Sequence, residues 1–267
     1  MGKHRHILFL LLTLLLCGCA KDNGKDQWVR LHLPVALEQT AVKSGSISLV
    51  DQLEVKAYDQ DGNYLDYIRF SCSRTGDGEF SAQGTLLRGE TYTLLFFAQT
   101  AGTYDIGPDG ILRQATDVPA SCATLDAFYA VETVTAGADD KLRVLLKRPF
   151  ALLHFAGDPV PAGARSQITL NAVPASVNLL SGETSGSVTV RFSEAPCPSA
   201  AEAAFAYVLA PEEEIRIGAE IGLSAGDFRA SRILRNIPVR RNYETTLRGD
   251  YFTTEGTIET DFNATSR

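Results

Sequence analysis

The chain has 267 residues, of which 45% are hydrophobic and 21% charged, with 22 Gly and 11 Pro. This globular composition excludes disorder over the whole chain as well as collagen-like and coiled-coil proteins. The length predicts one long or two medium domains. The formal net charge of −7 argues against nucleic-acid binding and against electrostatic attachment to an anionic membrane, because both depend on clustered Lys and Arg.

The N-terminus has the features of a lipoprotein signal. A basic start at Lys3–His6 precedes an apolar run at Ile7–Leu16. Ten helical residues span about 15 Å, roughly half of a bilayer core, so the segment predicts a cleaved signal and not a spanning helix. Leu16-Cys17-Gly18-Cys19 resembles the bacterial lipobox. We therefore expect removal of residues 1–18 and acylation of Cys19, including palmitate; the alternative is an ordinary secretory signal with a chance cysteine.

Three cysteines follow Cys19, namely Cys72, Cys122 and Cys197. Export favours oxidation, but an odd number of thiols cannot pair completely within one chain. Cys72 and Cys122 form the candidate disulfide because both lie in the first half; three buried free thiols are the alternative. The sequence contains no Cys-x-x-Cys motif or Cys/His cluster, so we expect no structural zinc site.

Most of the chain shows strand-length segments with alternating hydrophobicity. In Trp28–Leu37 one predicted face is apolar and consists of Val29, Leu31, Leu33, Val35 and Leu37. The opposite face carries Arg30, His32 and Pro34. The pattern predicts a half-buried strand, and Pro34 favours a position at a sheet edge.

Further strands are expected throughout the chain. Leu53–Tyr58 and Tyr64–Phe70 flank an Asp-Gly turn and predict a hairpin, and Thr91–Gln99 suits a central strand. The remaining expected strands are Ala127–Thr133, Lys141–Lys147, Phe150–Phe155, Ser166–Ala172, Ser187–Phe192, Phe205–Leu209, Glu214–Ile217, Phe228–Leu234, Tyr243–Asp250 and Thr257–Phe262. Gly76–Ser81 is interpreted as a loop and Gly102–Pro119 as an irregular excursion.

These patterns predict an all-β fold of two tandem antiparallel sandwiches. A tether at residues 19–26 precedes domains at 27–148 and 149–267, with the boundary near Arg148-Pro149. The one helix candidate is Ser199–Phe205, where Ser199 and Glu202 have capping-box spacing.

Signals for catalysis and metal binding are weak. Only His32 and His154 remain after signal cleavage, both lie within expected strands, and no G-x-S-x-G motif is present. The acidic loop Asp59–Asn63 lacks the glycine position and the final Glu of an EF-hand, and Glu212–Glu214 suits a solvated turn. We expect no enzyme activity, no cofactor and no metal, although a pair of catalytic carboxylates could exist without a sequence signature.

Arg148-Pro149-Phe150-Ala151, within Leu145–Phe155, lies at the expected start of the second domain. This stretch resembles the element that opens the second domain of the fimbrillin-related lipoproteins of Bacteroides-type bacteria. Val173–Gly182 contains the Pro-x-x-Val-Asn-x-x-x-Gly turn. Asn236–Thr253 is similar to their Asn-x-Pro-x-x-x-Asn-Tyr-x-Thr-x-x-x-Gly-x-x-x-Thr signature. Leu53–Leu65 and Asp126–Ala130 resemble parts of their first domain.

This resemblance implies tandem transthyretin-like sandwiches and a role in type V pili. It also implies strand exchange, in which cleavage after a basic residue vacates a groove that a partner's strand fills. Arg30 is the candidate cleavage position, although it lies inside the expected strand. The apolar residues of Trp28–Leu37 are the candidate exchanged set, and Thr257–Phe262 is a second segment that could donate or complete its own sheet.

The leading functional hypothesis is a structural, anchoring or adhesive pilus component, lipid-anchored at the outer membrane and facing the cell surface. Its expected partners are other pilus subunits or ligands on host or bacterial surfaces. The alternative is a monomeric surface lipoprotein that binds a glycan or host protein through exposed aromatic residues; the candidates are Trp28, Tyr104 and Tyr251. An exported hydrolase is a third, weaker hypothesis.

Overall fold

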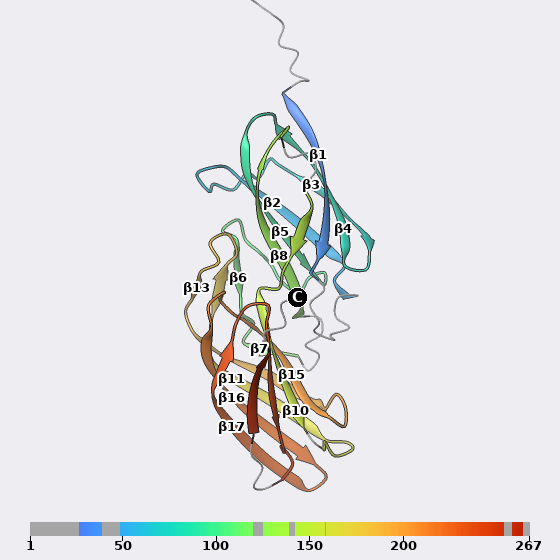
Figure 1. Ribbon diagram of the computed structural model, residues 1–267, viewed down its shortest axis with the longest axis vertical. Coiled ribbons are helices and arrows are strands. Elements are labelled where there is room, and N and C mark those ends of the chain that lie inside the picture. The colour runs from blue at the N-terminus through green and yellow to red at the C-terminus, as the bar shows by residue number, and fades with distance from the viewer. Residues whose placement is uncertain are drawn as a thin grey trace, which may run out of the picture.

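The computed structural model describes residues 27–38, 49–119, 125–138, 142–157 and 159–253, and the backbone of 258–263. These residues form strands joined by turns, with no α-helix among them, which confirms the all-β prediction. Figure 1 shows an elongated molecule in which strands from the two halves of the chain lie at opposite ends. In the described residues we find no helix long and apolar enough to cross a membrane.

The first sandwich packs two sheets face to face. One sheet has the order β3-β4-β1-β9 and consists of β3 (Phe70–Gly76), β4 (Glu79–Leu87), β1 (Trp28–Leu37) and β9 (Val144–Leu146). The other has the order β2-β5-β8 and consists of β2 (Gln52–Tyr58), β5 (Thr91–Gln99) and β8 (Ala127–Thr135). β5 is central, as its apolar sequence predicts, and its Leu94 and Phe96 are fully buried against β1 and β4 residues.

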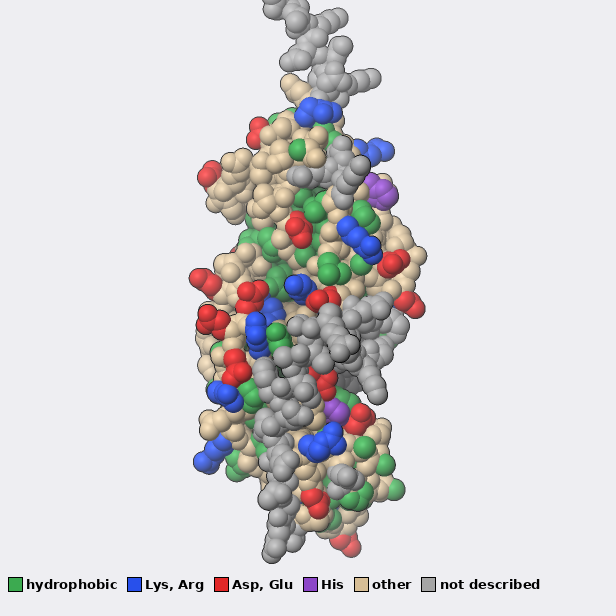
Figure 2. Space-filling model, in the orientation of Figure 1, with side chains coloured by type: hydrophobic (Ala, Val, Ile, Leu, Met, Phe, Trp, Pro, Cys, Tyr) green, Lys and Arg blue, Asp and Glu red, His purple; other side chains and the backbone are tan. Residues whose placement is uncertain are grey.

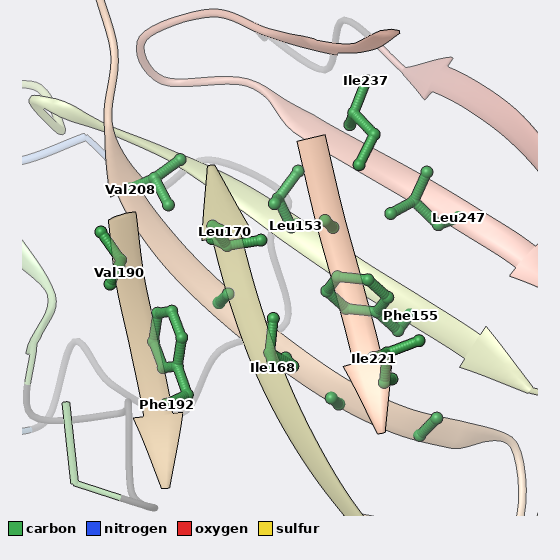
Figure 3. Close-up of a cluster of buried hydrophobic side chains, with 14 of the residues drawn as sticks. Leu153, Phe155, Ile168, Leu170, Val190, Phe192, Val208, Ile221, Ile237 and Leu247 are labelled. Carbon is green, nitrogen blue, oxygen red and sulfur yellow. The ribbon is translucent and has the colours of Figure 1, made fainter. Parts of the chain in front are cut away.

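The second sandwich is built in the same way from later strands. Its four-stranded sheet has the order β15-β10-β18-β19, with β15 (Glu202–Leu209), β10 (Phe150–Gly157), β18 (Glu244–Gly249) and β19 (Ile258–Asn263). Its five-stranded sheet has the order β17-β16-β11-β14-β7, with β17 (Phe228–Val239), β16 (Ile215–Ala225), β11 (Arg165–Val173), β14 (Val188–Pro196) and β7 (Asp117–Val118). Figure 3 shows Leu153 and Phe155 pointing toward Ile168 and Ile221 across the core.

The segment expected to be an irregular excursion connects the two halves. β6 (Ile111–Arg113) pairs with β12 (Ser176–Asn178), which also pairs with β13 (Thr184–Ser185), and β7 runs parallel to β14. A third apolar cluster lies between the sandwiches and joins side chains of β2, β5 and β6 to side chains of β10, β12 and β15. The domain limits 27–148 and 149–267 stay a prediction, but strands from both ranges share sheets.

Strand directions differ in part from the antiparallel expectation. Most pairings are antiparallel, but β1 with β9, β10 with β18 and β7 with β14 are parallel. Parallel pairing requires a connection that crosses the sandwich, and alternating hydrophobicity contains no signal for strand direction.

The predicted hairpin of Leu53–Tyr58 with Tyr64–Phe70 is wrong. β2 pairs with β5, and the two segments meet only at the isolated bridge between Tyr58 and Tyr64. The predicted turn itself is present, because Gly62 has φ of 82° and Asp59 accepts backbone N–H bonds from Asp61 and Asn63. The turn was therefore predicted correctly, but β2 takes its place in the sheet through long-range pairing with β5.

Two other local interpretations are also wrong. Gly76–Ser81 is the tight turn of the β3–β4 hairpin and the start of β4, with Gly78 at φ of 70°. Ser199–Phe205 is a turn followed by β15 and not a helix. The capping-box bonds do not form: the Ser199 hydroxyl donates to Glu202 Oε2 over 3.2 Å, while the backbone N–H groups of both residues donate to each other's carbonyl oxygens. Pairing of β15 with β10 holds the following segment extended.

Candidate functional site

β1 is seated as the alternating pattern predicts. Leu31, Leu33, Val35 and Leu37 are at most 4% exposed, and Val29 is half-buried and packs against the same core. β1 pairs with β4 over nine residues, Trp28 to Ala36, but with β9 only from Val35 to Leu37. Pro34 therefore lies in the part of β1 that has β4 as its only described neighbour. The four deeply buried side chains each contribute about 1.5–3 kcal/mol to docking of the strand.

Arg30 lies inside the paired part of β1. It is exposed and pairs with Thr85 of β4. All four deeply buried side chains follow Arg30, so a cut after this residue leaves them attached to the rest of the chain. The first sandwich would keep its filled groove after such a cut.

β19 lies at the other end of the described chain from β1, and it is an edge strand of its sheet. It is the last described strand, and in its sheet it pairs only with β18, antiparallel over six residues. The predicted strand at Thr257–Phe262 is thus confirmed within a residue at each end, and it completes the sheet of its own sandwich.

The cysteine predictions are only partly covered by the described residues. Cys72 and Cys197 are free, half-buried thiols, whereas Cys19 and Cys122 lie outside the described residues. Burial raises the pKa of Cys72 to about 11, so this thiol stays protonated at neutral pH. Cys72 lines a cavity of about 500 Å³ between β2 and β3. The Cys72–Cys122 pairing stays a prediction.

A buried ion pair at the boundary was missed by the sequence reasoning. Arg148 Nε donates to Asp126 Oδ1 over 2.8 Å, and the two side chains are 3% and 0% exposed. The guanidinium also lies 4.6 Å from the centre of the Phe128 ring. Both residues belong to segments that resemble the fimbrillin-related proteins, yet 22 positions separate them, so no local spacing indicates the contact.

A second buried arginine connects the two halves directly. Arg241 donates to the carbonyl oxygens of Ala210 and Gly182 and to the hydroxyl of Tyr129 on β8. Nearby, Asn242 Nδ2 donates to Glu38 Oε2 at the end of β1 over 2.8 Å. The joint is therefore polar as well as apolar.

The two histidines occupy different environments. His154 lies on β10 with Nδ1 3.1 Å from Glu244 Oε1, and its ring stacks on Phe205 at 4.7 Å. The hydrogen bond with His154 lowers the pKa of Glu244. His32 Nε2 lies 2.7 Å from the Ser81 hydroxyl, a contact between β1 and β4 that the sequence reasoning missed. No carboxylate among the described residues orients His32, so this pair lacks the third member of a hydrolase triad.

The structure also shows where the candidates for metal binding and for aromatic contact with a ligand lie. Among the described residues, no group of three or more His, Cys, Asp or Glu side chains could hold a metal ion. Trp28 is 48% exposed, whereas Tyr251 is fully buried and Tyr104 donates its hydroxyl to the carbonyl of Leu125. Trp28 is the most exposed of the three aromatic candidates. Lys and Arg are interspersed with Asp and Glu over the described part of the face in Figure 2.

The sequence model of one protein family matches residues 29–265, nearly the whole described chain, and its description is a family of unknown function, DUF6562. The chain belongs to the DUF6562 family. No curated protein matches the sequence of this DUF6562 chain.

Solved structures with the same fold include fimbrial and adhesion proteins. A putative cell adhesion protein from Bacteroides uniformis shares 9% identity with the DUF6562 chain, at a TM-score of 0.56, over 89% of this chain and 98% of that one. The tip fimbrial protein Mfa3 from Porphyromonas gingivalis, truncated at its C-terminus, shares 12% identity at a TM-score of 0.52, over 88% and 99%. A structure of putative polysaccharide binding proteins from Bacteroides thetaiotaomicron shares 10% identity at a TM-score of 0.54, over 88% of this chain and 98% of that one. The resemblance to fimbrillin-related proteins is confirmed at the level of the fold.

Proposed function

We propose that this DUF6562 protein is a lipid-anchored adhesive or anchoring component of type V fimbriae at the outer-membrane surface. In this proposal the halves are tandem transthyretin-like domains, and the role is binding and assembly without catalysis. The fold shared with the tip fimbrial protein and with the adhesion protein supports it. The lipobox at Cys19 supports the anchor.

The docking of β1 is the observation that carries the proposed position within a fimbria. In strand exchange, a subunit accepts a partner's strand only where its own strand has left. The groove between β4 and β9 is filled by four buried side chains of β1 that cleavage at Arg30 does not remove. Such a subunit cannot accept a strand in this groove and stands at the end of a fimbria, as an anchor or a tip.

The donor in this proposal is β19. A terminal strand at a sheet edge has hydrogen bonds to one neighbour only, so it can leave its own sheet at lower cost than a central strand. β19 meets both conditions in the described chain. A chain that keeps β1 and donates β19 joins one partner and not two.

Replacing Cys19 with Ser tests the anchor. The variant is expected to lose acyl labelling and to appear as an unprocessed or soluble species, because a hydroxyl cannot form the thioether that carries diacylglycerol. Labelling with an alkyne fatty acid and membrane fractionation measure both effects. Cys17→Ser is the matched control and should behave as wild type. Labelling that persists in Cys19→Ser overturns the lipobox assignment.

Three chains compared in the native organism test strand exchange: wild type, Arg30→Ala, and a chain ending at Thr253. We expect wild type and Arg30→Ala to be recovered equally in SDS-resistant fimbrial complexes, and the shortened chain to be absent from them. Thermal melts check that each chain is folded. Loss of Arg30→Ala from the complexes shows that cleavage at Arg30 is required, and recovery of the shortened chain removes β19 as the donor.

A further inference from the structure

The outer face of the first sandwich carries a groove that has no role in the proposed strand exchange. It has a volume of about 620 Å³, within the range of small-molecule sites. It lies over β1, β4 and the segment that leads into β3. Its lining includes Trp28, Tyr67, Arg30, Arg69, Gln83 and Thr85.

The register of the sheet arranges these side chains in rows. Arg30 of β1 pairs with Thr85 of β4, and one step along β4, Gly84 pairs with Phe70, which directly follows Arg69. Gln83 pairs with His32 on one side and with Ser71 on the other. The groove therefore has guanidinium groups on both flanks of β4 and a polar floor of hydroxyl and amide groups between them.

Aromatic rings form the walls. Tyr67 is 66% exposed and Trp28 48%, which makes them two of the most exposed large apolar side chains of the described residues. Phe70 does not add a third ring to these walls, because it pairs with Gly84 on the face of Leu31 and packs against the buried core. The two exposed rings that border the groove are therefore those of Trp28 and Tyr67.

The charge of the groove is opposite to that of the protein. Both side chains that carry a charge at neutral pH in its lining, Arg30 and Arg69, are basic, whereas the chain as a whole has a formal charge of −7. Neither arginine forms a hydrogen bond or ion pair with another described residue. Arg69 also lines the neighbouring cavity between β2 and β3. The acidic side chains of that cavity already have hydrogen-bond partners, because Asp51 accepts from the Ala101 N–H and Glu54 accepts from Lys56.

We infer that this groove binds a carboxylated saccharide. Faces of pyranose rings pack on exposed aromatic side chains, hydroxyl groups of a sugar match the amide of Gln83 and the hydroxyl of Thr85, and a guanidinium binds a carboxylate through two parallel N–H bonds. A sugar acid meets all three requirements, whereas a neutral sugar leaves both arginines unpaired. Two carboxylates on neighbouring residues of a chain would pair with Arg30 and Arg69 across β4.

This inference rests on the proposed adhesive role for its biological setting, but the two can fail separately. Saccharide binding is measured on the monomer, and assembly is measured by SDS-resistant complexes. The inference requires β1 to keep Trp28 and Arg30, so cleavage after Arg30 would remove two groups of the groove.

Trp28 provides the readout because it is the single tryptophan of the chain. The full chain in detergent is titrated with trigalacturonic acid and with its neutral methyl ester, and in parallel with 3′-sialyllactose and lactose, while tryptophan fluorescence and calorimetric heat are recorded. We expect a saturable fluorescence change with at least one of the two acids, an affinity that falls with added salt, and binding at least about tenfold weaker for the matching neutral sugar. The pair that binds identifies the uronic or the sialic source of the carboxylate.

Variants assign the binding to the groove. Arg30→Gln and Arg69→Gln should each weaken binding about tenfold or more, because a hydrogen-bonded charge is lost, and should keep the thermal melt of wild type because both side chains are exposed. Arg235→Gln, an exposed arginine on β17, is the matched control and should bind as wild type. The inference is overturned if neither acid binds at millimolar concentration, if acid and neutral sugars bind equally, or if Arg235→Gln weakens binding as much as the groove variants.

Discussion

Replacing Leu33 with Asp is expected to unfold the first sandwich. Leu33 is 0% exposed and faces the core from the middle of β1. The substitution removes about 1.5–3 kcal/mol of apolar burial and places a carboxylate inside a cluster of buried hydrophobic side chains. We expect a loss of about 4 kcal/mol or more, a large part of the 5–15 kcal/mol that a typical domain has.

The neighbouring position provides the control for Leu33. His32 lies on the same strand, is exposed and has one side-chain contact, with Ser81. His32→Asp should therefore cost about 1 kcal/mol. Denaturant titration followed by circular dichroism compares the two variants. Equal unfolding midpoints for Leu33→Asp and wild type would mean that β1 is not docked in solution, and the proposed position at the end of a fimbria would fall with it.

Replacing Arg148 with Met is expected to weaken the joint between the sandwiches. The substitution keeps the apolar stem of the side chain but leaves Asp126 as a buried carboxylate without its cation. Breaking a buried pair from one side costs about 3–5 kcal/mol. The Arg148→Met/Asp126→Leu double variant should recover part of this loss, because it removes the buried charge as well.

An exposed ion pair gives the matched control for Arg148. Arg165 lies 3.4 Å from Glu194, and their side chains are 44% and 51% exposed, so Arg165→Met should cost no more than about 1 kcal/mol. Thermal melts of the three variants and wild type decide the result. A single Arg148→Met variant that melts with Arg165→Met would show that the buried pair contributes little to stability.

Local pattern predicted those parts of the fold that depend on one strand at a time. The faces of β1, the central place of β5 and the position of β19 follow from alternation and β-forming residues. The hairpin from Leu53 and the helix from Ser199 failed for a common reason. In each case a short-range signal was present in the sequence, but pairing with a strand distant in sequence set the backbone.

The candidate site was less accessible to sequence reasoning than the fold. Arg30 was singled out as a cleavage position, but its neighbourhood with Arg69 depends on the register of β1 and β3 on β4, which no spacing encodes. The same holds for Arg148 with Asp126. Of the three aromatic candidates, Trp28 is more exposed than Tyr104 and Tyr251. The exposed fraction of an aromatic side chain depends on how the sandwich assembles, so the sequence did not distinguish them.

The direction of β1 determines how the molecule would carry mechanical load. β1 begins at the end of the molecule where the described chain starts and runs along its long axis toward the second sandwich (Figure 1). In a chain anchored by a lipid at Cys19, tension between the membrane and a bound ligand would pull on β1 along its own length. The ladder of β1 with β4 would then be loaded in shear, with its hydrogen bonds stretched together and not opened one after another. β1, which fills the groove of the first sandwich, would thus also be the strand that holds the protein to the membrane when flow pulls on a bound ligand.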